Sequence, residues 1–381
     1  MDMRMNRRGL LAAMAGAGAA AALGGRAFAA EDTAAVVARL FRDGIILDGN
    51  LAAPIDDSAP LPAEWADKIR GSALTATKVT LVGPGTGYAE TLQVLKAYET
   101  CVAMSPTVYA NVRTAGQIEA LKRAQKDGGP VGLIWSFETV EMLEGKVERI
   151  DEFAGLGVRV MQLSYNTASP FGAGVMTPAT ESTGLTPLGR EAIARMEARG
   201  VTLDLSHSDE RTVLEAVAAS KRPPLITHTG AAAIHGNPRN KTDRAMKAVA
   251  DKGGVVGIYN LSFITPVRAS QPTVDDYVDH VMHVLNLCGE DHTGIGSDAI
   301  LTGFDVTPES MKMWDEETAR RARAGVAAPE EGRPPYVEGM NRPDRMKVVA
   351  EALLKRGVKE KAVAKIMGGN FLRVFRETWG S

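Results

Sequence analysis

The chain has 381 residues, of which 45% are hydrophobic and 24% are charged, and its formal net charge is −2. This composition is typical of a soluble globular protein, and the length fits either two average domains or one α/β barrel. The sequence has no long basic or acidic block, which argues against a nucleic-acid partner and against a polybasic membrane anchor.

The first thirty residues differ in composition from the rest of the chain. The pair Arg7-Arg8 precedes a weakly apolar run rich in Ala, Gly and Leu, which ends in "AFAA". This order predicts a twin-arginine signal peptide at residues 1–29, and therefore a periplasmic protein. A single-pass anchor is the alternative, but the apolar run at residues 9–25 is short and weakly hydrophobic. We expect no stable membrane span.

From about residue 35, short apolar runs alternate with longer helical patterns. The apolar runs are continuous, as in strands that are buried on both faces. They lie at residues 44–49, 78–83, 131–138, 158–165, 201–207, 224–228, 254–260 and 293–298. Eight strands alternating with helices predict a parallel sheet, and eight strands close a (β/α)8 barrel of the TIM type. An open doubly wound sheet is the alternative, but no GxGxxG motif follows the first strand.

Two longer segments follow predicted strands and look like loops. Residues 166–185 follow the fourth strand, and residues 302–339 follow the eighth. Long segments beyond strand ends often form lids or substrate loops. We expect both inside a single barrel domain, residues 30–381, that ends in closing C-terminal helices. Cys101 and Cys288 lie in or just after helical patterns, so two unpaired thiols are favoured over a disulfide.

Five predicted strands end on polar side chains of the kind that bind metals or substrates. These are Glu138, Tyr165, His207, His228 and Asp298, which end strands three, four, five, six and eight. Barrel active sites lie at the carboxyl ends of the strands, so these side chains should meet at one mouth. Two imidazoles and one carboxylate suit zinc and leave a position for water or substrate. The aspartate is then placed to accept a proton from that water.

The remaining candidates lie outside the strand ends. Arg239 follows the sixth strand in a polar loop, where an arginine can clamp a substrate carboxylate with two hydrogen bonds. His235 lies in the same loop and could support the site. His280 and His283 share one helix face, where packing or surface roles are favoured over metal binding. His292 precedes the eighth strand, at the wrong end for the site.

The runs "DLSH", "ITHTGAAAIHGNPRNKTD", "GIGSD" and "IMGGNFLRV" resemble the membrane dipeptidase (renal dipeptidase) family, a zinc-dependent branch of the amidohydrolase barrels. The resemblance extends in order over nearly the whole chain after the signal. It implies that Glu138 bridges two metals and that His207 and His228 hold the second of them. It also implies that Asp298 handles protons and that Arg239 holds the substrate carboxylate. These enzymes cleave dipeptides, some relatives cleave other small amides, and relatives are often dimers, so a homodimer is expected.

Two departures from the family fall on the reacting centre. The family usually ends its first strand with "DGHND", whose histidine and aspartate bind the first metal. Here Asn50 stands where the histidine is expected and Ala52 where the aspartate is expected, so this metal position is degenerate. One zinc is expected, and two only if Asp56 or Asp57 substitutes. Tyr165 stands where the family typically has a histidine; it can donate a hydrogen bond to an oxyanion but carries no positive charge.

Two hypotheses follow from these observations. The first is a metal-dependent hydrolase of dipeptides or small N-acyl amino acids, whose substrate carries a free carboxylate. The second is a dipeptidase-like protein without ordinary peptidase activity, which binds or helps mature an exported peptide-derived metabolite. The residues at positions 50, 52 and 165 favour the second hypothesis, whereas the retained strand-end ligands favour the first.

Overall fold

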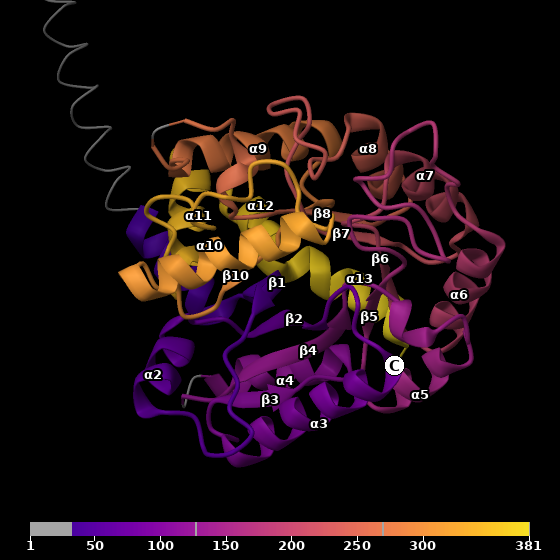
Figure 1. Ribbon diagram of the computed structural model, residues 1–381. Helices are drawn as coiled ribbons and strands as arrows, with labels where there is room; N and C mark the ends of the chain where they lie inside the picture. Colours follow the sequence, from indigo (N-terminus) through magenta and orange to yellow (C-terminus); the bar gives the residue numbers. More distant parts are fainter. Residues whose placement is uncertain (1–32, 126–127, 269, 381) are drawn as a thin grey trace, which may run out of the picture.

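The computed structural model describes residues 33–125, 128–268 and 270–380 (Figure 1). The predicted signal peptide therefore lies outside the described residues. Within the described ranges, no helix is both long enough and apolar enough to cross a membrane.

The strands of the described chain form one sheet in which every pairing is parallel. The strands are β1 (Leu47–Ala52), β2 (Ala76–Val82), β3 (Tyr109–Asn111), β4 (Val131–Phe137), β5 (Val160–Gln162), β6 (Thr202–Asp204), β7 (Leu225–Thr229), β8 (Val255–Ile258), β9 (Thr293–Ile295) and β10 (Ala299–Ile300). Their order is β10-β1-β2-β4-β5-β6-β7-β8-β9, and β3 pairs only with the first half of β4.

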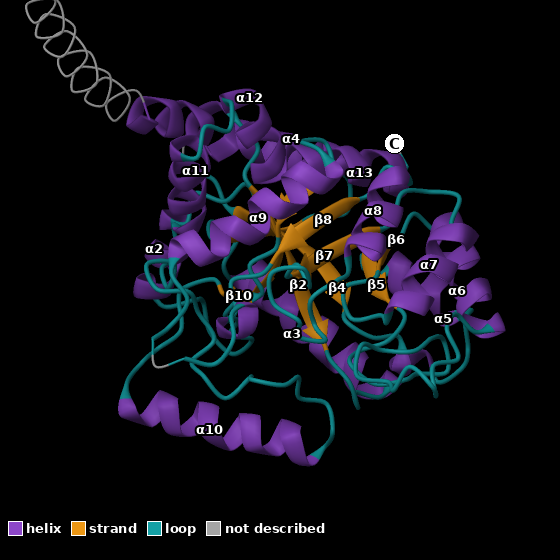
Figure 2. Cartoon of the chain, turned by 90° about the horizontal axis from the view of Figure 1, so that it is seen from above, coloured by secondary structure: helices purple, strands orange, loops and turns teal. Residues whose placement is uncertain are grey.

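The first and last parts of the sheet meet through β9 and β10, two short strands that are separated by three residues. β9 pairs with β8, while β10 pairs with β1 in the register Leu51–Ala299 and Ala52–Ile300. Between these two strands, the amide of Asp298 donates to the carbonyl of Asn50 at 2.7 Å. The sheet thus curls round to its own first strand, and the predicted (β/α)8 class is confirmed. Figure 2 shows the strands in the middle of the molecule with helices around them.

Helices follow most of the strands and pack on the outside of the sheet. They are α2 (Ala63–Gly71), α3 (Tyr88–Met104), α4 (Ala115–Ala124), α5 (Arg149–Gly155), α6 (Pro187–Ala198), α7 (Glu210–Ala219), α8 (Asp243–Asp251), α9 (Val274–Cys288), α11 (Arg345–Lys355), α12 (Glu360–Ala364) and α13 (Asn370–Trp379), with short turns η2 (Glu141–Leu143), η3 (Ser262–Ile264) and η4 (Lys365–Gly369). Several begin at a capping threonine: the side chains of Thr186, Thr242 and Thr273 cap α6, α8 and α9 by accepting a backbone N–H.

The C-terminal helix α13 closes one end of the barrel. Phe371, which is fully buried, packs its ring against Gly49 of β1 and Gly294 of β9. A Cβ atom at either glycine would lie 2.6–2.7 Å from that ring, so only glycine fits there without movement. The opposite end, where the strands finish at their carboxyl ends, is left for the site.

The segment at residues 302–339 is not the loop that its polar sequence predicted. It contains α10 (Pro308–Arg323), which starts at the cap Thr307 with a proline in its first turn. The structure describes every residue of α10, and none of them is buried. A helix that buries no face needs no apolar stripe, so the sequence lacks the periodic pattern that predicts a packed helix. Figure 2 shows α10 set apart from the other helices and joined to the barrel by loops. Cys101 and Cys288 are free thiols, as expected.

Candidate active site

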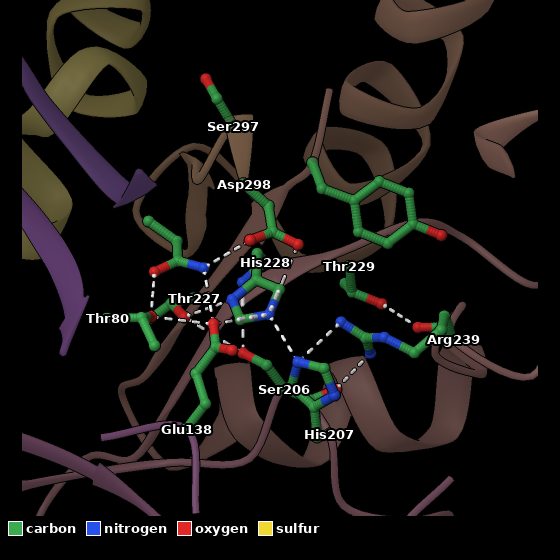
Figure 3. Close-up of polar contacts among 12 residues, drawn as sticks. Thr80, Glu138, Ser206, His207, Thr227, His228, Thr229, Arg239, Ser297 and Asp298 are labelled. Atoms are coloured by element: carbon green, nitrogen blue, oxygen red, sulfur yellow. Dashed lines mark hydrogen bonds and ion pairs between the residues drawn. The ribbon is translucent and has the colours of Figure 1, made fainter. Parts of the chain in front are cut away.

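The strand ends bring the candidate side chains to one mouth of the barrel (Figure 3). Glu138 directly follows β4, His207 lies just beyond β6, and His228 belongs to β7. Asp298 lies between β9 and β10, and Tyr165 lies just beyond β5. These strands are parallel, so their carboxyl ends share one side of the sheet.

The imidazoles of His207 and His228 face each other through their Nε2 atoms, which are 2.9 Å apart. Nδ1 of His207 lies 2.7 Å from Oδ1 of Asn166, which is the accepting end of that amide because its Nδ2 donates to the carbonyl of Val326. Nδ1 of His207 therefore carries the proton, and its Nε2 atom presents a lone pair.

The second histidine has the same tautomer for a different reason. The hydroxyl of Thr227 donates to Oδ2 of Asp204 at 2.6 Å, so its oxygen accepts from Nδ1 of His228 at 2.9 Å. Two Nε2 lone pairs consequently point at each other, an arrangement that a nearby cation stabilises. The guanidinium of Arg239, whose Nη2 lies 3.2 Å from Nε2 of His207, supplies one cation, and a metal ion held by the two imidazoles would supply another.

The charge state of the two imidazoles also suits a metal. Burial, reinforced by the positive charge of Arg239, lowers the pKa of His207 and of His228 well below the ordinary value. Neutral imidazole is the form that binds metals. Glu138 completes the set, since one donor atom from each of the three residues lies within 4.8 Å of the others. Two histidines and a carboxylate fit a zinc-type site that keeps a position open.

Asp298 lies beside this cluster with its own unusual geometry. Its φ is +53°, in the left-handed region that aspartate tolerates better than most residues. Its Oδ1 accepts from Nδ2 of Asn50 at 2.8 Å, and its Oδ2 lies 4.0 Å from Nε2 of His228. Burial, with a further contribution from the charge of Glu138, raises the pKa of Asp298 to about 7. A carboxyl with such a pKa exchanges protons near neutrality.

Arg239 is buried beside the histidines rather than exposed in its loop. It donates from Nη1 to the carbonyl of Ser206 at 2.8 Å, and its Nη2 lies 3.2 Å from Nε2 of His207. Its guanidinium also lies 5.8 Å from the ring centroid of Tyr259. The side chain therefore reaches the cavity with a fixed orientation, as a carboxylate clamp requires.

Tyr165 contributes a ring and a hydroxyl to the same mouth. Its ring stacks on His207 with the centroids 4.1 Å apart and an interplanar angle of 21°. Its hydroxyl accepts from Nη2 of Arg321 at 3.2 Å, and this arginine in turn pairs with Glu331 at 3.0 Å. Burial raises the pKa of Tyr165 far above neutrality, so the hydroxyl stays protonated and can donate.

The degenerate positions of the first strand hold no metal ligand of their own. Asn50 is buried and donates from Nδ2 to Oε1 of Glu138 at 2.9 Å. Ala52 lines the cavity with its methyl group. The carboxylate of Asp56 accepts from the amide and the hydroxyl of Ser58 in a surface turn, and Asp57 is exposed. The structure therefore does not place either aspartate as a substitute ligand.

A cavity of about 300 Å³ opens above these groups, at the small end of the range for ligand pockets. Its polar lining includes Tyr165, His207, Arg239 and Asp298, and also Glu317, Arg321 and Glu331 from the segment after β10. Its apolar side comes from aromatic residues of the segments after β8 and β10: Phe263, Phe304, Trp314 and Tyr336. This combination suits a small molecule that carries a charged group and an apolar group.

The other histidines do not contact this cluster. His235 bonds to Glu330 at 2.8 Å, and His283 pairs with Asp243 at 2.7 Å. His280 is buried and accepts the amide of Ala231 at 2.9 Å through Nδ1. His292 contacts the carbonyl of Gly254 at 2.8 Å. The packing and surface roles expected for His280 and His283 agree with these contacts.

Several polar residues of the site were not identified from the sequence. They are Lys78, Thr80, Asn166, Thr227 and Arg321, which contact the candidate side chains directly, and Asp204, which accepts from Thr227 behind His228. Lys78 could have been recognised from the sequence as a candidate, because a charged residue within a strand that is buried on both faces is rare. Arg321 could not, since it comes from a helix that the apolar pattern did not reveal.

A parallel barrel with a histidine–carboxylate cluster at the carboxyl ends of its strands defines the class of metallohydrolase barrels. The profile of the family described as "Membrane dipeptidase (Peptidase family M19)" matches residues 66–318 and 324–379. The chain belongs to this family, and the resemblance noted in the sequence is confirmed.

Individual relatives agree with this assignment. Dipeptidase tcpJ of Claviceps purpurea is 30% identical over 225 residues, which are 59% of this chain and 46% of that protein. Uncharacterized dipeptidase C965.12 of Schizosaccharomyces pombe is 29% identical over 50% of this chain and 45% of its own length. The match thus spans about half the length of these curated relatives.

Solved structures resemble the chain over most of its length. An amidohydrolase from Pseudomonas aeruginosa superposes with a TM-score of 0.78 at 28% identity, covering 91% of this chain and 99% of that one. A metallo peptidase from Rhodobacter sphaeroides, liganded with a phosphinate mimic of the dipeptide L-Ala-D-Ala, has a TM-score of 0.68 at 19% identity, covering 88% and 100%. The second likeness shows the shared fold.

Proposed function

We propose that this protein is a metal-dependent hydrolase of dipeptides or small N-acyl amino acids. The observation that carries the proposal is the cluster of Glu138, His207 and His228, whose donor atoms converge within 4.8 Å. Asp298 and Arg239 line the same cavity, so proton transfer and carboxylate binding have groups within reach. Membership of the dipeptidase family and the dipeptide mimic in the Rhodobacter relative support the substrate class.

The metal proposed here is zinc, one ion per chain, held by the two Nε2 atoms and the Glu138 carboxylate. A metal in such a site supplies Lewis acidity for the scissile carbonyl and activates water. The protein groups do the rest: Arg239 orients the substrate through its carboxylate, Asp298 accepts a proton and returns it to the leaving amine, and the Tyr165 hydroxyl donates to the carbonyl oxygen. The aromatic wall above them excludes water from the reacting bond.

The test is the zinc content and the activity of the mature protein. We expect about one zinc per chain by plasma mass spectrometry, and hydrolysis of a panel of L,L- and L,D-dipeptides and N-acyl amino acids. His207→Ala should lose both metal and activity, whereas His292→Ala, which alters a histidine away from the cavity, should keep both. A wild-type protein with no tightly held metal and no turnover would contradict the proposal.

A second function is favoured by the residues at positions 50 and 52, which cannot form an ordinary two-metal site. In this alternative the protein binds, or helps mature, an exported peptide-derived metabolite without cleaving ordinary peptides. Thermal shift measurements with the dipeptide panel separate the two functions. A dipeptide that binds without being cleaved raises the melting temperature of the protein and remains intact in the sample.

The location and assembly of the protein are further proposals. The Arg7-Arg8 pair and the apolar run after it support export to the periplasm by a twin-arginine signal. A homodimer is proposed from the behaviour of the family. Light scattering coupled to gel filtration of the mature chain tests this state directly.

A further inference from the structure

Lys78 is a buried cation to which the proposed reaction gives no role. It lies within β2, and its side chain is fully removed from solvent. Its ammonium donates to Oδ1 of Asn50 at 2.9 Å and lies 3.6 Å from Oδ2 of Asp204. A buried ammonium is costly unless nearby groups compensate it, so its retention inside the barrel calls for an explanation.

Asn50 links this ammonium to two carboxylates of the site. Its Nδ2 donates to Oε1 of Glu138 at 2.9 Å and to Oδ1 of Asp298 at 2.8 Å. Its Oδ1 accepts from Lys78, and the hydroxyl of Thr80 lies within 3.1 Å of the same oxygen. These contacts allow only one orientation of the amide, with its nitrogen toward the acids and its oxygen toward the cation.

The two carboxylates need a positive charge behind them. Both bond to one amide nitrogen, and their mutual repulsion is weakly screened on the side of Glu138 and Asn50, which are buried. The Lys78 ammonium is the cation that the Asn50 amide connects to this pair, since Oδ1 of Asn50 accepts from it at 2.9 Å. A dication held beside residues 50 and 52 would provide the same compensation, but Ala52 has no donor atom for one.

We propose that the Lys78 ammonium, which lies next to Asn50 behind Glu138 and Asp298, is a built-in cation that balances these two carboxylates and restricts the centre to one divalent metal. Lys78 is thus a positioning residue, which contacts neither substrate nor the three metal ligands. The proposal deepens the proposed function and rests on it for the metal held by Glu138 and the histidines.

The test restores the missing ligands with and without the lysine. The variants are Asn50→His/Ala52→Asp and the same pair combined with Lys78→Met, and zinc is counted by plasma mass spectrometry and titrated against a chromophoric chelator. We expect the triple variant to take about two zinc ions per chain. The double variant should bind its second zinc at least tenfold more weakly, since it keeps the ammonium.

The matched control is Asn50→His/Ala52→Asp combined with Lys241→Met. Lys241 is another buried lysine, whose ammonium bonds to the carbonyl of Ser208, outside the Asn50 network. This control should behave like the double variant. Lys78→Gln serves as a second neutral replacement if the methionine variant does not fold by circular dichroism.

A double variant that binds the second zinc as tightly as the triple variant would overturn the proposal, as would a gain of affinity in the Lys241 control. The zinc content of the wild-type protein tests the proposed function separately. If wild type holds no zinc, the metal proposal fails, whereas the comparison of double and triple variants still decides the role of Lys78.

Discussion

Arg321 of α10 donates a hydrogen bond of 3.2 Å to the hydroxyl of Tyr165. The helix that lies apart from the barrel is thereby tied to a ring that stacks on a candidate metal ligand. Arg321 is held from its other side by Glu331, at the end of the same segment. The position of α10 and the orientation of the tyrosine hydroxyl are therefore set together.

Arg321→Met should lower kcat/KM by about 10- to 100-fold, because the Tyr165 hydroxyl loses the contact that orients it. Metal content should not change, since Arg321 contacts no ligand. Arg320→Met is the matched control, because that arginine is on the same helix but exposed, and it pairs with Glu317. Equal loss of activity in both variants would show that the helix, and not the contact, matters.

Thr227→Val should weaken zinc binding by about 10- to 100-fold, because the hydroxyl that fixes the tautomer of His228 is lost. Competition with a chelator measures the change. Thr293→Val is the control, since that buried hydroxyl bonds to the carbonyl of Gly289, away from the site. Unchanged affinity in Thr227→Val would mean that the Thr227–Asp204 pair does not support the ligand.

The stability of the metal-free protein should depend on pH through Asp298. Its folded pKa of about 7 exceeds the unfolded value of 3.8, so the folded state binds the extra proton between these limits. The contribution of this group to stability is therefore present below about pH 4 and is lost as the pH rises through 7.

Asp298→Asn removes this titration, so the variant should gain stability relative to wild type as the pH increases from 4 to 7. The gain should be on the order of a few kcal/mol at most. Urea unfolding after chelation, at several pH values, measures the difference. The lowered pKa of each histidine acts in the opposite direction but is common to both proteins, so it cancels. A difference that does not vary with pH would contradict the prediction.

Replacing Arg7 and Arg8 together by lysine should block export, because the twin-arginine signal is read through both guanidinium groups. The periplasmic fraction, probed with an antibody against the mature chain, should fall strongly. Arg26→Lys, which changes an arginine near the end of the same segment, should export normally. Export of the double variant at the wild-type level would exclude this route.

The sequence was sufficient to predict the strands and helices that leave a pattern in consecutive residues. The eight apolar runs correspond to β1, β2 and β4 to β9, because strands buried on both faces leave continuous hydrophobic stretches. β3 was not predicted, since three residues give too short a pattern, and α10 was not predicted because it buries no face. The strand-end residues were found for the same local reason.

The contacts among site residues could not be predicted from the pattern. The bond between Lys78 and Asn50 joins neighbouring strands, and its meaning depends on Glu138 and Asp298, which arrive from two further strands. Sequence spacing says which side chains share a mouth but not which atoms meet there. The sequence of the first strand therefore suggested the loss of a metal position, whereas the structure shows that Asn50 is hydrogen-bonded to Lys78, Glu138 and Asp298.

The pairing of β10 with β1 has a consequence for biosynthesis. Asp298 and its neighbours reach β1 only after nearly three hundred residues have been made, and α13, which seals the other end, is the last helix described. A chain that has been made only as far as His228 therefore lacks both the closing strand and the plug. The centre can assume its final geometry only once β10 and α13 have been made, so metal capture by a shorter nascent chain would involve an unshaped site and is expected to be weak.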